Sequence, residues 1–297
     1  MRIAAPFVAL SLLLGCATTK AEAGLPAGGA PVPLTFAWPD GFQARVTLEH
    51  REQRSGAPPA QARASHRLVA ERRGKAIWVS VRGIEAEGDV PDLELNVRIS
   101  EALIQVVSPA GAYLRTEGLE NALEILGVGG DEARDVARGA LDRISALDWE
   151  ITAGGWAGRA FSPGRKVSGQ FPGSVPLIPG VPALLEVEQS LLGPVPCEEG
   201  EEAARCVKLS WRGAPSQAAR QGALERLHRE AGSEGPALED LDGTVEATLV
   251  TEPATLVPHG LAVREELHLR VRQPGGDLLE VVERADDRYR FTPELEL

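Results

Sequence analysis

The sequence is poor in the residues that catalytic and cofactor sites usually need. Its 297 residues include three cysteines, five histidines and one methionine, and only 4% of the residues are aromatic. No His-Glu-x-x-His, Gly-x-Ser-x-Gly, Cys-x-x-Cys or Gly-x-Gly-x-x-Gly pattern occurs in it. The sequence therefore predicts no cofactor and no metal site. It argues against an enzyme without excluding one.

Long hydrophobic runs and basic residues are also scarce. After the first apolar stretch, Ile3 to Leu14, no run of eighteen apolar residues follows that would cross a bilayer as a helix. Asp and Glu number 43 against 31 Lys and Arg, which gives a net charge of −12. An acidic chain of this kind repels phosphate backbones, so no nucleic-acid partner is expected.

The N-terminus has the layout of a secretory signal. Arg2 supplies a positive charge, and the apolar stretch after it is too short for a stable transmembrane helix. The stretch ends in Leu13-Leu14-Gly15-Cys16. This segment resembles the lipobox of bacterial lipoproteins, in which an invariant cysteine follows apolar and small residues.

The resemblance implies cleavage before Cys16 and attachment of lipid to its thiol. Two or more acyl chains hold a protein stably at a membrane. Ala17, in place of Asp, favours the outer membrane by analogy with enterobacterial sorting. We therefore expect a signal peptide at 1–15, a lipidated cysteine and flexible tether at 16–33, and one secreted domain at 34–297.

Two cysteines remain once Cys16 is lipidated. Cys197 and Cys206 flank a polar, glutamate-rich segment between two apolar ones. In an oxidising compartment this pattern favours a disulfide across a hairpin. A metal pair and a redox pair are the alternatives, and both are disfavoured because there is no Cys-x-x-Cys spacing and no histidine nearby in the sequence.

The first part of the mature chain alternates between apolar and polar residues, as half-buried strands do. The apolar sets are Phe42, Ala44, Val46 and Leu48, then Leu68 and Ala70, then Ile77, Val79 and Val81, and finally Leu93, Leu95, Val97 and Ile99. Gly- and Pro-rich breaks separate them. The pattern predicts antiparallel strands with one face exposed to water.

The middle of the chain changes to helical spacing. A first helix is expected from Leu119 to Leu126, ending at Gly127. Asp131 is expected to cap a second helix that runs to Leu147. A third should begin at Ser216 and end at Gly232, and the stretch from Trp149 to Pro182 should be mostly turns with short extended pieces.

The last segment returns to strands. Asp242-Gly243 has the composition of a tight turn, and alternating strands follow over 263–271 and 279–291. Strands, then helices, then strands indicate the α+β class: a curved antiparallel sheet, in a shape similar to a half-barrel, with two or three helices packed on it. This layout resembles the half-barrel lipoprotein carriers and chaperones of the bacterial envelope, through fold analogy alone.

No histidine or serine has a motif around it. His50 and His66 can face each other across a hairpin, but Arg and Glu neighbours place them on an apparently exposed face. His228, His259 and His268 have no metal-ligand spacing. Ser168 and Ser174 lie in turn-rich sequence, and turn residues explain them better than a nucleophile does.

Three further features of the sequence have residue types that can bind a ligand. Gly127 to Gly130 can cradle an anion before a helix, but the end of one helix and the start of the next explain it better. The acidic cluster Glu198, Glu199, Glu201 and Glu202 lacks the ligand order of a calcium loop and is expected at a solvated hairpin tip. The tryptophans are expected mainly to supply core area; they are Trp38, Trp78, Trp149, Trp156 and Trp211. Trp78 is out of phase with Ile77 and Val79, which places it on the opposite face of the sheet, where it can line a ligand surface or pack under a helix; packing is favoured.

These observations leave three hypotheses, in order of preference. The first is a membrane-anchored envelope lipoprotein without enzymatic activity, whose sheet binds an apolar ligand or a partner protein. The second is a structural or assembly component of the outer envelope. The third is a hydrolase with a site assembled in space around His259 or His50, which a histidine beside a carboxylate or serine in a cleft would favour.

Overall fold

The computed structural model describes residues 29–231, 237–273 and 277–294, so Cys16 and most of the predicted tether lie outside the described residues. The strands are β1 (Val32–Leu34), β2 (Gln43–Arg54), β3 (Ala60–Arg73), β4 (Ala76–Gly88), β5 (Ile104–Val107), β6 (Tyr113–Glu117), β7 (Arg159–Phe161), β8 (Lys166–Val175), β9 (Ile178–Val195), β10 (Cys206–Pro215), β11 (Ala237–Thr251), β12 (Pro258–Arg272) and β13 (Leu278–Glu294). The helices are α1 (Leu93–Ala102), α2 (Leu119–Ile125), α3 (Asp131–Trp149), a π-helical turn η1 (Glu150–Gly154) and α4 (Gln217–Ala231).

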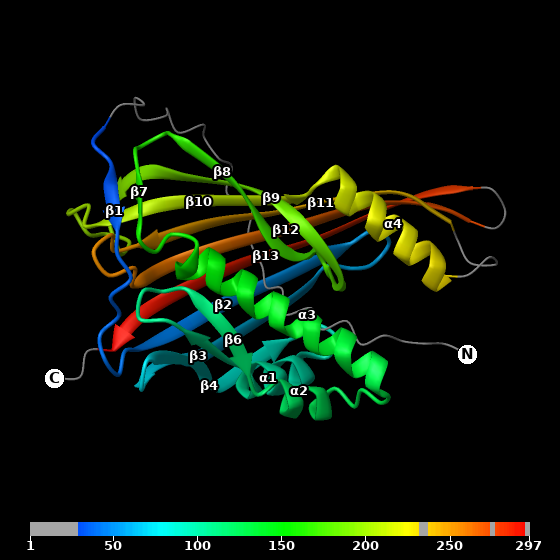
Figure 1. Cartoon of the computed structure of the whole chain (residues 1–297), viewed down its shortest axis with the longest axis horizontal. Helices are drawn as coiled ribbons and strands as arrows, with labels where there is room; N and C mark the ends of the chain where they lie inside the picture. The colour runs from blue at the N-terminus through cyan, green and yellow to red at the C-terminus, as the bar shows by residue number, and fades with distance from the viewer. Residues whose placement is uncertain (1–28, 232–236, 274–276, 295–297) are drawn as a thin grey trace.

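One large antiparallel sheet dominates the molecule (Figure 1). Its 11 strands run in the order β6-β5-β4-β3-β2-β13-β12-β11-β10-β9-β8, so it is open, with β6 and β8 at its edges. The first long strand, β2, pairs with the last, β13, and this pairing joins the two ends of the described chain at the centre of the sheet. The predicted α+β class with an antiparallel sheet and packed helices is confirmed.

Alternation of side chains gives the sheet an inner and an outer face. On β2, Ala44, Val46 and Leu48 are buried while the residues between them are exposed or nearly so. Figure 1 shows α3 crossing in front of the sheet and α4 lying against its far end. The main core lies between this inner face and the helices, and a smaller core around Ile99, Leu123 and Leu141 joins α1, α2 and α3.

Three of the four helices are as the sequence predicts, with one change at a cap. Gly127 ends the first with a positive φ of 65°, and the Ser216 hydroxyl accepts a hydrogen bond from the Ala219 amide at the start of α4. The cap of α3 is Gly130, and no side chain hydrogen-bonds there, so the predicted role of Asp131 as the cap is wrong. Among the described residues, no helix is long and apolar enough to cross a membrane.

The predicted strand over Leu93–Ile99 is wrong, because this segment is helix α1. Apolar residues at every second position also contain a helical set, here Leu95 and Ile99 one turn apart. Both pack in the small core, and Ile99 is fully buried there. The helical set packs in the small core with α2 and α3, and α1 also lies against β4, so tertiary contacts accompany the helical period, which the strand prediction did not consider.

The turn predicted at Asp242-Gly243 is also wrong. Both residues lie inside β11, where Gly243 pairs with Leu267 of β12. A Cβ on Gly243 would lie 3.2 Å from both the Glu266 carbonyl oxygen and the Pro176 ring. The glycine therefore permits a close approach between strands and a loop rather than a reversal of the chain.

Hydrogen bonds join the segment before β2 to the turn between β11 and β12. The amides of Thr35 and Ala37 donate to the carbonyl oxygens of Pro253 and Thr255, at 2.9 and 3.0 Å. The Trp38 indole donates to the carbonyl oxygen of Leu256 at 2.9 Å. The first described strand, β1, begins at Val32 and pairs with β7, so the tether predicted to run to residue 33 overlaps this strand.

Candidate ligand cavity and disulfide–histidine cluster

A cavity of about 200 Å³ lies between the inner face of the sheet and the helices. Strands β2, β3, β4, β12 and β13 form its floor, and α1, α3 and η1 form its roof. Most of its lining is apolar, including Leu48, Leu68, Val79, Trp149 and Phe291. It has the composition expected of a site for a small apolar molecule.

Small residues keep the cavity open. Ala64 of β3 lies opposite Leu48 on one side and opposite Ala86 on the other. Ala62, one position along the same face, also lines the cavity. An alanine side chain fills much less space than a leucine or tryptophan, so these positions contribute volume to the cavity next to β3.

One end of the cavity is polar. Asp287 of β13 lies opposite His50 of β2, and Tyr289 donates a hydrogen bond to Asp287 Oδ2 at 3.2 Å. Glu265 of β12 also lines the cavity and accepts a hydrogen bond from the Leu177 amide at 3.1 Å. Asp148, at the end of α3, completes the group. The cavity thus offers three carboxyl groups to one end of an otherwise apolar ligand.

The surroundings shift the pKa of several of these groups. Burial among protein atoms, and then the charge of Glu265, raise the pKa of Asp148 to about 7, although its side chain remains accessible within the concavity. Burial also raises the pKa of Glu265, against the opposing effect of the Leu177 amide. Burial lowers the pKa of His66 to about 4. Near neutral pH, the desolvated end of the cavity therefore holds less charge than its residue types suggest.

The prediction that His50 and His66 lie on an exposed face is wrong. His50 is buried, His66 is half-buried, and both line the cavity. His50 continues the inward set Val46 and Leu48 of β2, so its position in the alternation outweighs its charged neighbours. A histidine beside a carboxylate in a cleft is also the feature that favours a hydrolase, because such a pair can move a proton.

A second polar cluster surrounds the expected disulfide between Cys197 and Cys206, which is present in the structure. It closes the hairpin between β9 and β10, and both cysteines are buried. Glu201 stabilises the hairpin tip, because its carboxylate accepts hydrogen bonds from the Cys197 amide at 3.2 Å and from Arg205 at 2.7 Å. The glutamate cluster therefore lies at a hairpin tip, as predicted.

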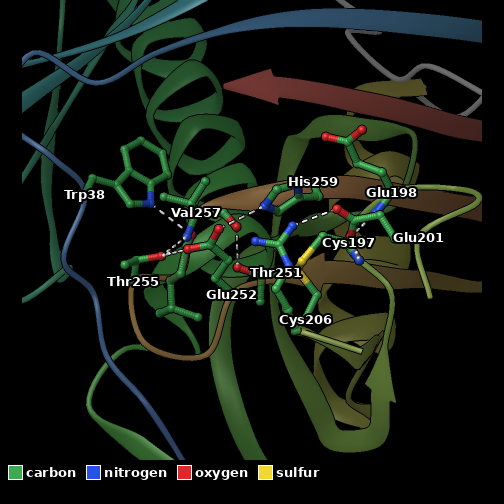
Figure 2. A network of polar contacts seen from close by, with 12 residues as sticks. Trp38, Cys197, Glu198, Glu201, Cys206, Thr251, Glu252, Thr255, Val257 and His259 are labelled. Atoms are coloured by element: carbon green, nitrogen blue, oxygen red, sulfur yellow. Dashed lines mark hydrogen bonds and ion pairs between the residues drawn. A yellow bond between two sulfur atoms is a disulfide. The ribbon is translucent and has the colours of Figure 1, made fainter. Parts of the chain in front are cut away.

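Figure 2 shows His259 next to this disulfide. One ligand atom from each of Cys197, Cys206 and His259 lies within 4.8 Å of the others. His259 Nε2 lies 3.3 Å from Glu252 Oε1, and the other oxygen of Glu252 accepts a hydrogen bond from the Thr255 hydroxyl at 2.8 Å. The sequence argument that no histidine lies near the cysteines is therefore wrong in space, because β12 brings His259 to the hairpin.

The other residues considered as catalytic or ligand-binding candidates lie in strands, in a helix connection, on the surface or in the core. Ser168 and Ser174 lie in strand β8 rather than in turns, and Arg143 donates to the Ser174 hydroxyl at 3.1 Å. Residues 127–130 connect α2 to α3, which confirms the prediction that one helix ends and the next begins there. His228 and His268 are exposed. Trp78 is half-buried and lies under the Arg73 guanidinium at 4.5 Å, whereas the other four tryptophans are buried.

Sequence reasoning missed Asp148, Asp287, Glu252 and Tyr289. Asp287 and Tyr289 share their parity with Phe291 on β13, so the alternation of that strand already points them inward. Asp148 lies one residue after Leu147, at the edge of the apolar stripe of α3. No local signal marks Glu252, because its role depends on the pairing of β11 with β12.

Comparison with known proteins gives remote structural likenesses. No family model matches the chain, and no curated protein matches it. A lipovitellin structure concerned with lipid–protein interactions aligns with a TM-score of 0.46 at 8% identity, over 88% of this chain and 26% of that one. DynF, from the dynemicin biosynthesis pathway of Micromonospora chersina, aligns at 0.22 and 10% identity over 96% of both chains. The chain spans about a quarter of the lipovitellin chain, and likenesses this remote identify no function.

Proposed function

We propose that the chain is a lipid-anchored envelope protein that binds an apolar ligand in the cavity between β2–β4, β12–β13 and the helices. The observation that carries the proposal is the cavity itself, whose walls are apolar and whose volume is about 200 Å³. Dry apolar cavities of about 150 Å³ already admit a benzene-sized molecule. The site suits a small apolar molecule or one segment of an acyl chain.

The polar end refines the kind of ligand. Three carboxyl groups and His50 lie at that end, while Trp38, Trp149 and Phe291 line the apolar part. A wholly apolar ligand would remove water from these polar groups without offering them hydrogen bonds, and the cost of this desolvation would weaken binding. The better candidate is therefore an apolar body that bears one hydrogen-bonding group.

Tryptophan fluorescence tests the proposal directly. Trp38 and Trp149 line the cavity, so a brominated fatty acid bound there should quench their emission in a saturable way. The protein for this experiment is the chain from Ala17 onward, which lacks both the apolar leader and the lipidated cysteine. Native mass spectrometry of the same protein should show an added mass that disappears after solvent extraction.

A matched pair of variants separates the cavity from the rest of the sheet. Ala64→Phe fills the hollow and should weaken binding at least tenfold, because a phenyl ring replaces the volume of the ligand. Ala262→Phe adds the same ring on β12, but at an exposed position outside the cavity, and should leave binding unchanged. Equal binding by both variants would rule out the cavity as the site.

The anchor is tested separately. We infer from the lipobox-like segment that Cys16 carries lipid and holds the protein at the outer membrane. Growth with a labelled fatty acid should label the wild-type protein and leave Cys16→Ser unlabelled. Fractionation should place the labelled wild-type protein with the outer membrane.

The other two hypotheses rest on weaker observations. The pairing of His50 with Asp287 inside the cavity favours a hydrolase, and in that case His50→Gln would abolish turnover of an apolar ester probe. An assembly component would present an apolar patch. The exposed large apolar residues of the described chain are instead spread over β6, α3, β8, β9 and β13.

A further inference from the structure

The disulfide hairpin holds a set of metal-ligand atoms that the binding function does not use. Cys197, Cys206 and His259 are all buried, and their ligand atoms lie within 4.8 Å of one another. In a tetrahedral zinc site, ligands about 2.0–2.3 Å from the metal are about 3.3–3.8 Å apart. Shifts of about 1 Å would therefore bring these three atoms to zinc-binding distances.

The setting of His259 is that of a metal ligand. Its Nε2 lies 3.3 Å from Glu252, while its Nδ1 is buried without a hydrogen-bond partner among the described residues. Histidines that bind metals usually donate their second ring N–H to a carboxylate, which fixes the ring and its tautomer. Here Glu252 fits that role and leaves Nδ1 as the nitrogen with a free lone pair.

Glu252 is itself held firmly. Its second carboxylate oxygen accepts from the Thr255 hydroxyl at 2.8 Å, and its amide donates to the Val257 carbonyl oxygen at 3.2 Å. Thr251 donates to the same carbonyl at 2.9 Å, as Figure 2 shows. These bonds to Glu252 and its neighbours do not involve the two sulfur atoms, so reduction of the disulfide removes none of them.

We propose that reduction of the Cys197–Cys206 disulfide converts this cluster into a zinc site with two thiolates and His259 as ligands. A dithiol reductant transfers two electrons to the disulfide, leaves two thiols on the protein and becomes a cyclic disulfide itself. Zinc then replaces the two thiol protons, which pass to solvent. The fourth position is open to water, because Cys197 and His259 also line a surface hollow of about 630 Å³.

The test uses the full chain with Cys16→Ser, so that the hairpin cysteines are the remaining two. The protein is reduced with dithiothreitol, freed of reductant without air, and titrated with zinc against a chromophoric chelator. We expect one zinc per reduced chain, bound at least a hundredfold more tightly than by the oxidised chain. Cobalt in place of zinc should give the visible absorption of a tetrahedral thiolate site.

Variants identify the ligands. His259→Ala should weaken zinc binding at least tenfold, and Glu252→Gln about tenfold to a hundredfold through the orientation of the ring. His268→Ala is the control, because this exposed histidine lies on the same strand and away from the cluster. Equal zinc binding by the oxidised and reduced chains, or by His259→Ala and the parent, would overturn the proposal. So would a reduced chain that has lost its circular dichroism spectrum and does not regain it with zinc.

Discussion

The two halves of the sheet differ in what fills the space beneath the helices. In the half formed by β9, β10 and β11, large side chains lie fully buried on the inner face, among them Trp211, Leu185 and Leu241. In the half formed by β2, β3 and β4, Ala62 and Ala64 occupy comparable inward positions and a cavity lies above them. Side-chain volume thus separates a solid core from a binding site within one continuous sheet.

At Gly213 on β10, the solid half has no room for one additional methyl group. A Cβ on Gly213 of β10 would lie 2.4 Å from the Trp211 ring. The hollow half has free volume instead, and His50 and His66 on its strands line that volume together with Asp287 of β13 and Glu265 of β12. We infer that the solid half supplies stability and that the hollow half can keep polar groups inside because of it.

The largest expected effect on the free energy of unfolding comes from removing a large buried side chain from the solid half. Trp211→Ala should lower the free energy of unfolding by about 3–5 kcal/mol, because a fully buried ring is replaced by a cavity. Trp78→Ala, which removes a half-buried ring stacked on Arg73, should cost only about 1 kcal/mol. Urea denaturation followed by circular dichroism measures both, and similar losses would contradict the contrast.

Next in size is the effect of adding volume to each half. Gly213→Ala should lower the free energy of unfolding by about 1–3 kcal/mol, because a single methyl group overpacks the core against Trp211. Ala64→Phe adds a whole phenyl ring to the cavity and should change it by less than about 1 kcal/mol. The comparison fails if Ala64→Phe proves the more damaging of the two in thermal or urea unfolding.

The smallest effect is a pH dependence that belongs to the hollow half. Burial lowers the pKa of His66 to about 4, so between pH 6.5 and pH 4 the unfolded chain binds a proton that the folded chain does not. This histidine therefore makes the protein less stable as the pH falls through that window. The raised pKa of Asp148 acts in the opposite direction, since the folded chain then binds the extra proton.

His66→Gln isolates the histidine contribution. The variant should lose less stability than the parent between pH 7 and pH 5, by an amount on the order of 1 kcal/mol. Urea unfolding at pH 5, 6 and 7 measures this difference. Parallel pH profiles for parent and variant would show that His66 is protonated equally in the folded and unfolded chains.

The sequence predicted the fold class because each long strand has one face in the core. Val46 and Leu48 alternate with exposed residues as a half-buried strand requires. Helix α1 escaped prediction because its apolar residues satisfy two periods, and its contacts with β4 and with the small core distinguish them only in the folded chain. Asp242-Gly243 misled because a glycine needed for close packing has the same local composition as a turn.

The candidate sites were harder to predict for a different reason. His50 has the same parity as Val46 and Leu48, so its inward position was available from the sequence, but its charged neighbours argued otherwise. The link between His259 and the cysteines depends on the order of β9 to β12 in the sheet. Pairing between distant strands is a property of the whole chain, and no local pattern encodes it.

The hydrogen bonds of the segment before β2 determine which part of the fold would resist a force applied to the N-terminal side of the chain. Tension applied at residue 29 meets the β1–β7 pair and then the bonds from Thr35, Ala37 and Trp38 to the turn at 253–256. These bonds resist before the pull reaches β2. A pull on the N-terminal anchor that we propose would thus be borne where this segment is hydrogen-bonded to the turn at 253–256, and the strands that line the cavity would keep their shape.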